Sequence, residues 1–102
     1  MSDTVEKLKE IIARNYEYVQ RLVTMSFEYD IINGDVFEVI QAFLDAAYEL
    51  LTKENDSAVK LVNAVKFITF AEILHTIAVE SDRKTTQRVI NAVLRSMNSI
   101  KV

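Results

Sequence analysis

The residues best suited to chemistry are Glu72 and His75, which form a Glu-x-x-His pair. Residues three apart lie on one face of a helix, and this spacing supplies ligands to di-iron sites in four-helix bundles. Such a site needs two of these pairs and two further glutamates, so only a symmetric dimer would bring together enough ligands. The simpler interpretation is that His75 is hydrogen-bonded to Glu72 or to a backbone carbonyl group. We expect no metal here.

The chain lacks the residues that other common catalytic sites need. The chain has no cysteine, which excludes disulfides, thiolate metal sites and cysteine nucleophiles. A Ser-His-Asp triad would have only His75 to supply its imidazole, and no strained nucleophile turn is visible. The one glycine, Gly34, rules out a glycine-rich phosphate loop. We therefore expect no enzyme activity, no cofactor and no small-molecule substrate.

A basic stripe near the C-terminal end is the second candidate site. Lys84, Arg88, Asn91 and Arg95 recur at spacings of four, three and four, and Arg83 is adjacent. On one helix face these cations suit phosphate groups, and Asn91 suits a base edge. Against nucleic acid stand a sequence pI of about 5.1 and the lack of a helix-turn-helix signature. The alternative is a solvated helix face, or pairing with an acidic helix.

The net charge of −3 hides a gradient along the chain. Residues 1–56 hold 12 acids and 5 bases, whereas residues 81–102 hold 5 bases and 1 acid. Either an acidic helix packs beside a basic one within the fold, or the two ends face different partners. The first interpretation is the simpler one.

Hydrophobic periodicity predicts four helices in a single domain. The chain of 102 residues is 50% hydrophobic and has one glycine and no proline, which fits a few long helices joined by short loops. Apolar residues recur at spacings of three and four, as in amphipathic helices. We expect an all-α fold, an antiparallel up-down four-helix bundle with a buried central third helix, with helices at residues 3–28, 35–54, 57–80 and 83–99.

Turn and cap residues mark the expected helix ends. The dipeptide Asn33-Gly34 favours a turn with positive φ, and Asp35 is the expected cap of the second helix. Asp56 or Ser57 is expected to cap the third helix, and Ser81-Asp82 to separate it from the fourth. Ile31 and Ile32, in the first turn, are expected to pack against the core.

The third helix is the centre of the expected fold. Its polar residues recur almost every third position, so the polar row winds around the helix and leaves apolar side chains in every direction. The first half is expected to present one apolar side, made up of Ala58, Leu61, Val62, Val65 and Ile68. The second half is expected to present nearly the opposite side, made up of Phe67, Phe70, Leu74 and Ile77. A helix that is apolar all round must be covered on most sides. Either the other three helices cover it, or a protein partner does, through the anchoring residues Phe67, Phe70, Leu74 and Ile77.

The hairpin of the second and third helices carries a resemblance. The run from Asp45-Ala46-Ala47-Tyr48 to Asn55-Asp56, followed by Ala58, resembles a family of short archaeal all-helical proteins of unknown function. The resemblance covers residues 37–78. This chain has Glu54-Asn55 where that family has Gly before the Asp, and Glu72-Ile73-Leu74 near the place of a Trp-Leu-Asp ending. The resemblance implies an archaeal helical bundle and no assigned activity.

The amino-acid composition, in contrast to any motif, is similar to that of another group of proteins. Abundant Ile, Val, Asn and Lys make the chain similar to small crenarchaeal proteins, including helical accessory subunits of the family B DNA polymerase.

These observations predict a small non-catalytic protein–protein interaction module that self-associates or serves as an accessory subunit. The alternative is a nucleic-acid-associated accessory factor that uses Arg83, Lys84, Arg88, Asn91 and Arg95. The first residues, SDTVEKLKEII, have no signal-peptide pattern. Charged residues within the third helix, such as Lys66 and Glu72, would be costly in a bilayer. We therefore expect a soluble, cytoplasmic protein with no membrane partner.

Overall fold

The structure, a computed structural model, describes residues 2–52 and 57–100, with side chains for residues 4–52 and 57–96. It contains α1 (Ser2–Glu28), α2 (Gly34–Thr52), α3 (Ala58–Glu80) and α4 (Arg83–Ile100). No strand occurs in these described ranges, so the expected all-α class is confirmed. The helix ends lie within two residues of those expected from the sequence, and residues 53–56 lie outside the described residues.

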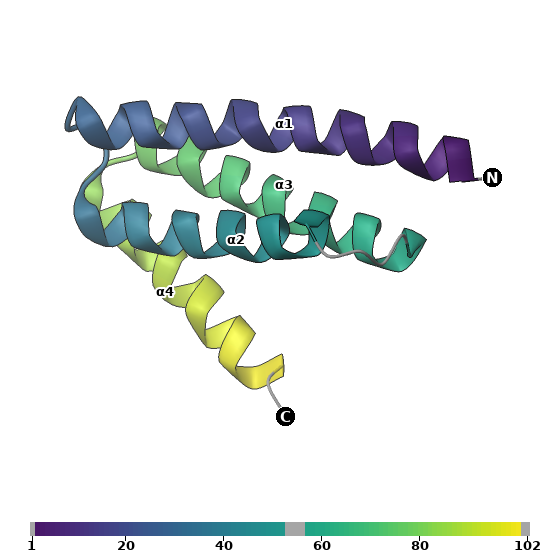
Figure 1. Ribbon diagram of the computed structural model, residues 1–102. Coiled ribbons are helices and arrows are strands. Elements are labelled where there is room, and N and C mark those ends of the chain that lie inside the picture. The colour runs from purple at the N-terminus through teal and green to yellow at the C-terminus, as the bar shows by residue number, and fades with distance from the viewer. Residues whose placement is uncertain (1, 53–56, 101–102) are drawn as a thin grey trace.

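Three helices run side by side, and the fourth leaves them at an angle. Successive helices α1, α2 and α3 alternate in direction, and α3 contacts each of the other three (Figure 1). Helix α4 starts at the same end of the molecule as α2 and then projects away, so its C-terminal half does not lie along the other helices (Figure 1). The radius of gyration of 14.6 Å accordingly exceeds the roughly 13 Å typical of a compact domain of this length.

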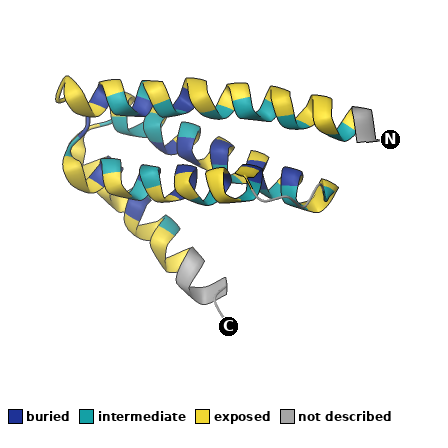
Figure 2. Ribbon diagram, viewed as in Figure 1, coloured by how far each residue is buried: buried dark blue, intermediate teal, exposed yellow. Residues whose placement is uncertain are grey.

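The core lies where α1, α2 and α3 meet, with one contribution from α4. Helix α2 supplies the largest share, because its apolar residues follow spacings of three and four without interruption. Figure 2 shows the buried positions along the facing sides of these helices. The buried apolar residues are Val19, Val23, Ile32, Val36, Ile40, Phe43, Leu44, Ala47, Leu51, Leu61, Ala64, Ile68, Ala71, Leu74 and Ile90.

Helix α3 is buried along one straight row and is open on the opposite side. The row consists of Leu61, Ala64, Ile68, Ala71 and Leu74, at spacings of three and four that keep one face of a helix. Both α1 and α2 pack against this row, and its two alanines permit close approach. This row takes residues from both of the apolar sides expected from the sequence, since Leu61 and Ile68 come from the first-half set and Leu74 from the second. Val62 and Val65 of the first-half set are exposed on the other side.

The turn between α1 and α2 differs in detail from the sequence expectation. The residue with positive φ is Asp30, at 60°, rather than Asn33 or Gly34. The Asp30 N–H donates to the Phe27 carbonyl at 3.1 Å, and the Ile31 N–H donates to the Ser26 carbonyl at 2.8 Å. This pair of bonds is a Schellman motif, which ends α1 with a left-handed residue at the position that glycine usually occupies.

Asn33 starts α2 in place of Asp35. The Asn33 Oδ1 accepts a hydrogen bond from the Val36 N–H at 2.9 Å, as an N-cap side chain does. Of the two isoleucines in the turn, Ile32 is buried in the core as expected, whereas Ile31 is 54% exposed. The left-handed residue lies three positions before Asn33, directly after α1, and the cap of α2 lies two positions before Asp35.

The caps of the last two helices follow the sequence. Ser57 Oγ accepts from the Val59 N–H at 3.2 Å, and Asp82 Oδ1 accepts from the Thr85 N–H at 2.6 Å. The hydrogen bonds from Thr85 hold the pKa of Asp82 below its ordinary value. Asp82 thereby separates α3 from α4 and caps the first turn of α4.

Candidate functional site

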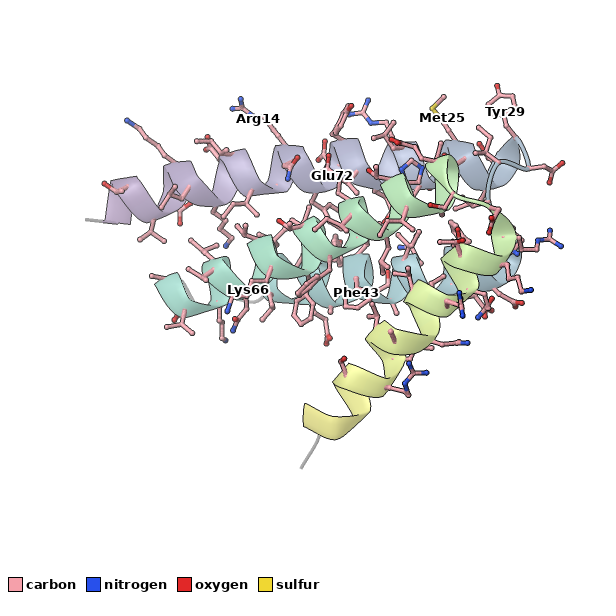
Figure 3. The ribbon with its side chains drawn as sticks, turned by 180° about the vertical axis from the view of Figure 1, so that it is seen from behind. Arg14, Met25, Tyr29, Phe43, Lys66 and Glu72 are labelled. Atoms are coloured by element: carbon pink, nitrogen blue, oxygen red, sulfur yellow. The ribbon has the colours of Figure 1, made fainter. Side chains whose placement is uncertain are left out.

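An apolar groove lies on the side of α2 and α3 from which α4 diverges. It encloses about 250 Å³ and opens to solvent between the helices. In Figure 3, which shows the molecule from behind, Phe43 lies beside α3 in the angle between α3 and α4. The groove is lined by Val39, Ala42, Phe43 and Ala46 of α2, Phe67 of α3 and Leu94 of α4, with Glu38 at its edge.

The aromatic rings of Phe43 and Phe67 line the groove, and the Phe70 ring packs against Phe43 beside it. The Phe43 ring is buried, and its centroid lies 6.2 Å from that of Phe67 and 5.9 Å from that of Phe70. Tilted ring pairs at this separation are mutually stabilising, so the cluster is a firm surface for an incoming side chain. Opposite the rings, Ala42 and Ala46 leave the backbone of α2 open to close approach by another helix.

The groove continues into the uncovered side of α3, which we call the open face of α3. Phe70 belongs to both surfaces, because its ring contacts Phe43 while half of the residue is exposed. A shallow hollow of about 320 Å³ lies farther along, around Ile73 and Ile77. Large contiguous apolar surfaces are unusual on monomeric soluble proteins and mark interaction sites. The open face of α3 carries Val59, Val62, Val65, Phe70 and Ile73, each at least 43% exposed.

An acidic row runs along α2 beside the groove. Its residues are Glu38, Asp45 and Glu49, all exposed and separated by seven and four positions. Asp45 accepts a hydrogen bond from the Gln41 Nε2 at 2.9 Å. Among the described residues none of the three carboxylates forms an ion pair. The groove therefore has an edge of uncompensated negative charge.

The predicted basic stripe is a solvated face of α4. Arg83, Lys84, Arg88, Asn91 and Arg95 are all exposed, whereas Thr86 and Ile90 are the buried residues among the described side chains of α4. No ion pair joins these cations to the acidic row within the described part of the chain. Of the two interpretations of the stripe, its exposed side chains fit the solvated face. Helices α2 and α4 nevertheless contact each other.

The four residues predicted as interface anchors do not form a single surface patch. Phe67 is half-buried in the wall of the groove, and Phe70 is half-exposed at the junction with the open face. Ile77 is half-buried at the hollow beside Ile73. Leu74 is only 4% exposed and belongs to the core.

Sequence reasoning missed the groove residues Val39 and Leu94. From sequence alone, Ala42 and Ala46 indicate only that a neighbouring helix can approach closely. The signal was the four-residue spacing of the two alanines beside Phe43. Its meaning depends on the departure of α4, which the sequence pattern does not show.

A side-chain hydrogen bond of His75 joins α3 to α1. Its Nε2 atom lies 2.6 Å from the Ser26 hydroxyl oxygen, so its partner is neither Glu72 nor a backbone carbonyl group. Burial lowers the pKa of His75, and the nearby Glu72 carboxylate opposes that shift. Among the described residues no three His, Asp or Glu side chains gather as metal ligands would. The His75 side chain thus belongs to the contact between α1 and α3.

A second, more polar cleft lies where the two tight turns meet. It encloses about 240 Å³ and includes Asp30 and Asn33 from the first turn and Ser81 and Arg83 from the second. Thr86 lies at its base, and the Thr86 Oγ1 is buried without a hydrogen-bond partner among the described residues.

Helix α3 is long and apolar enough to cross a membrane, by length and composition alone. Core helices of soluble proteins meet the same criterion, so a single helix of this kind is weak evidence for a membrane.

Comparison with protein-family models, with curated proteins and with solved structures gives no match for this chain. The resemblance of the α2–α3 hairpin to short archaeal helical proteins stays a prediction.

Proposed function

We propose that this protein is a small, non-catalytic protein–protein interaction module, whose groove binds an amphipathic helix of another polypeptide chain. The observation that carries the proposal is the groove itself: α4 diverges and leaves Val39, Ala42, Phe43 and Phe67 without a helix over them. Burial of apolar surface contributes roughly 25 cal/mol per Å², so a helix that covers the exposed parts of Val39, Ala42 and Phe67 gains free energy from each of them.

The shape and chemistry of the groove favour a helix as its ligand. Two helices form its walls, and an amphipathic helix fills such a groove with apolar residues at positions i, i+3, i+4 and i+7. Phe43, Phe67 and Phe70 supply an aromatic surface of the kind that dominates binding energy at protein interfaces. The acidic row adds a preference for basic residues along one edge of the ligand.

The experiment is photo-cross-linking from the groove in cells. A photoreactive phenylalanine analogue replaces Ala42 in one sample and Asn15, exposed on α1, in the control. We expect a cross-link to a polypeptide from position 42 only, with a peptide of helical apolar spacing identified by mass spectrometry. A chain that forms no polypeptide cross-link from position 42, or equal ones from both positions, would contradict the proposal.

A second candidate function is supported by the exposed basic stripe. As an accessory factor, the protein would contact nucleic acid through Lys84 and Arg88, and binding would fall steeply as salt rises. Labelled duplex and single-stranded oligonucleotides test this at about 50 mM salt. The double variant Lys84→Glu, Arg88→Glu should then lose binding, whereas Phe70→Asp should retain it. No binding by the unaltered chain would discard this function.

A further inference from the structure

We propose that the helix bound in the groove is α4 of a second copy of this chain, in a reciprocal two-fold dimer. This inference rests on the proposed function of the groove and names its partner. In such an arrangement each copy donates its α4 to the other and receives one in return, so both grooves are filled. Two-fold symmetric dimers with one self-complementary surface are the commonest oligomers.

The charges of the chain supply the first reason. The acidic row on α2 and the basic stripe on α4 are both exposed, and neither is paired within the described part of one molecule. Opposite charges on one surface of the same chain are the condition for a self-complementary interface. A dimer that brings them together also explains why acids collect before residue 57 and bases after residue 82.

The spacing of those charges supplies the second reason and gives the direction of the docked helix. Along α2 the acids are Glu38, Asp45 and Glu49, with intervals of seven and four. Along α4, taken backwards, the cations are Arg95, Arg88 and Lys84, with the same intervals of seven and four. At 1.5 Å per residue both rows have steps of about 10.5 Å and 6 Å, so an antiparallel α4 matches all three charges at once.

The antiparallel direction identifies the source of the helix as another molecule. Within one chain, α2 and α4 begin at the same end of the fold, and α4 then diverges from α2 (Figure 1). A chain cannot reverse its own α4 without breaking the cap at Asp82, which fixes the start of that helix. The α4 of a second copy meets no such constraint.

The apolar residues fit the same register. When Arg95 of the second copy is opposite Glu38, Leu94 of that copy is opposite Val39, in the lining of the groove. Leu94 is 40% exposed in a single chain, so it has surface left to bury. The two α4 helices then pass each other close to the two-fold axis.

The test is a charge exchange followed by sedimentation equilibrium. The first variant carries Glu38→Lys, Asp45→Lys and Glu49→Lys, and the second carries Lys84→Glu, Arg88→Glu and Arg95→Glu. Because like charges then face each other, we expect each variant alone to dimerise roughly tenfold or more weakly than the unaltered chain. An equimolar mixture should recover association, since both interfaces of the mixed dimer regain opposite charges. A control with Glu10→Lys and Glu17→Lys on the exposed side of α1 should dimerise like the unaltered chain.

Three results would overturn the inference: an unaltered chain that stays monomeric at about 1 mM, a dimer that neither charge reversal weakens, or a mixture that does not recover. Circular dichroism confirms that each variant is folded, and the single changes Asp45→Lys and Arg88→Glu replace the triple sets if folding is lost. A monomeric chain that still forms cross-links from position 42 to a different protein would refute the second copy and leave the proposed function intact.

Discussion

The Ser26 hydroxyl oxygen lies 2.6 Å from Nε2 of His75, and this contact joins α1 to α3 near the end where all four helices begin or end. The two residues are 49 positions apart, so no local pattern links them. Ser26 is 6% exposed, and its carbonyl oxygen accepts the Ile31 N–H hydrogen bond of the Schellman motif. One residue therefore anchors both the end of α1 and the central helix.

Stability should decrease as the pH falls below the ordinary His pKa of 6.5, because burial lowers the pKa of His75 in the folded chain. Between the lowered value and 6.5 the unfolded chain binds a proton that the folded chain does not, and this favours unfolding. The full contribution of neutral His75 to the free energy of unfolding is present above pH 6.5. Urea unfolding from about pH 8 to about pH 5 measures it. The control His75→Gln keeps a hydrogen-bonding side chain, and an unchanged pH profile in that variant would contradict the assignment.

Replacement of Thr86 by valine should stabilise the protein. The Thr86 Oγ1 is buried without a hydrogen-bond partner among the described residues, and valine has the same shape without the hydroxyl group. We expect the free energy of unfolding to rise by about 1 kcal/mol. Thr69→Val, at an exposed threonine of α3, is the matched control and should change little. A destabilised Thr86→Val would show that the hydroxyl has a partner, such as a bound water or ligand in the polar cleft.

Glycine should be better than aspartate at position 30, whereas alanine should be tolerated at position 34. Asp30 has a φ of 60°, which only glycine adopts without cost, so Asp30→Gly should stabilise the chain by about 0.5 kcal/mol. Gly34 has no positive φ, and an added Cβ would meet only Phe27 Cε1 at an ordinary 3.9 Å. Thermal unfolding of both variants checks the pair. A loss of more than about 1 kcal/mol in Gly34→Ala would refute this description of the turn.

The two sides of α3 should respond differently to truncation. Leu74→Ala removes a buried side chain and leaves a cavity, which should lower the free energy of unfolding by about 2–5 kcal/mol. Ile73→Ala, its neighbour on the open face, should cost less than about 1 kcal/mol because Ile73 is 48% exposed. Equal losses would mean that the open face is covered within a single chain.

The sequence predicted the helices well because their signals are local. Spacings of three and four identified the buried residues of α2, and Asp82 and Ser57 marked two helix starts by capping chemistry. The turn after α1 was placed too late, because an Asn-Gly pair is the stronger sequence signal even where Asp30 takes the left-handed conformation. Which residue takes the left-handed conformation depends on where α1 ends its contact with the other helices.

The groove was beyond prediction because it depends on the path of α4. Alanines at positions 42 and 46 favour close approach of a neighbouring helix. The sequence does not say which helix that is. The structure turns α4 away and leaves Phe43 and Phe67 facing an open groove. Periodicity predicts which face of a helix is apolar, whereas it does not say which of two apolar faces a neighbour will cover.

The most direct test of the docking groove is the reactivity of a thiol placed in it. The chain has no cysteine, so Ala42→Cys carries a single reactive group, and Asn15→Cys is the control on α1. The rate of maleimide labelling is measured for each variant in dilute pure protein, in concentrated pure protein and in extract of the native cells. If a helix fills the groove, labelling at position 42 slows by roughly tenfold or more in the concentrated protein or in the extract, while position 15 is unaffected. Equal labelling rates at position 42 under all three conditions would contradict a docking function for the groove.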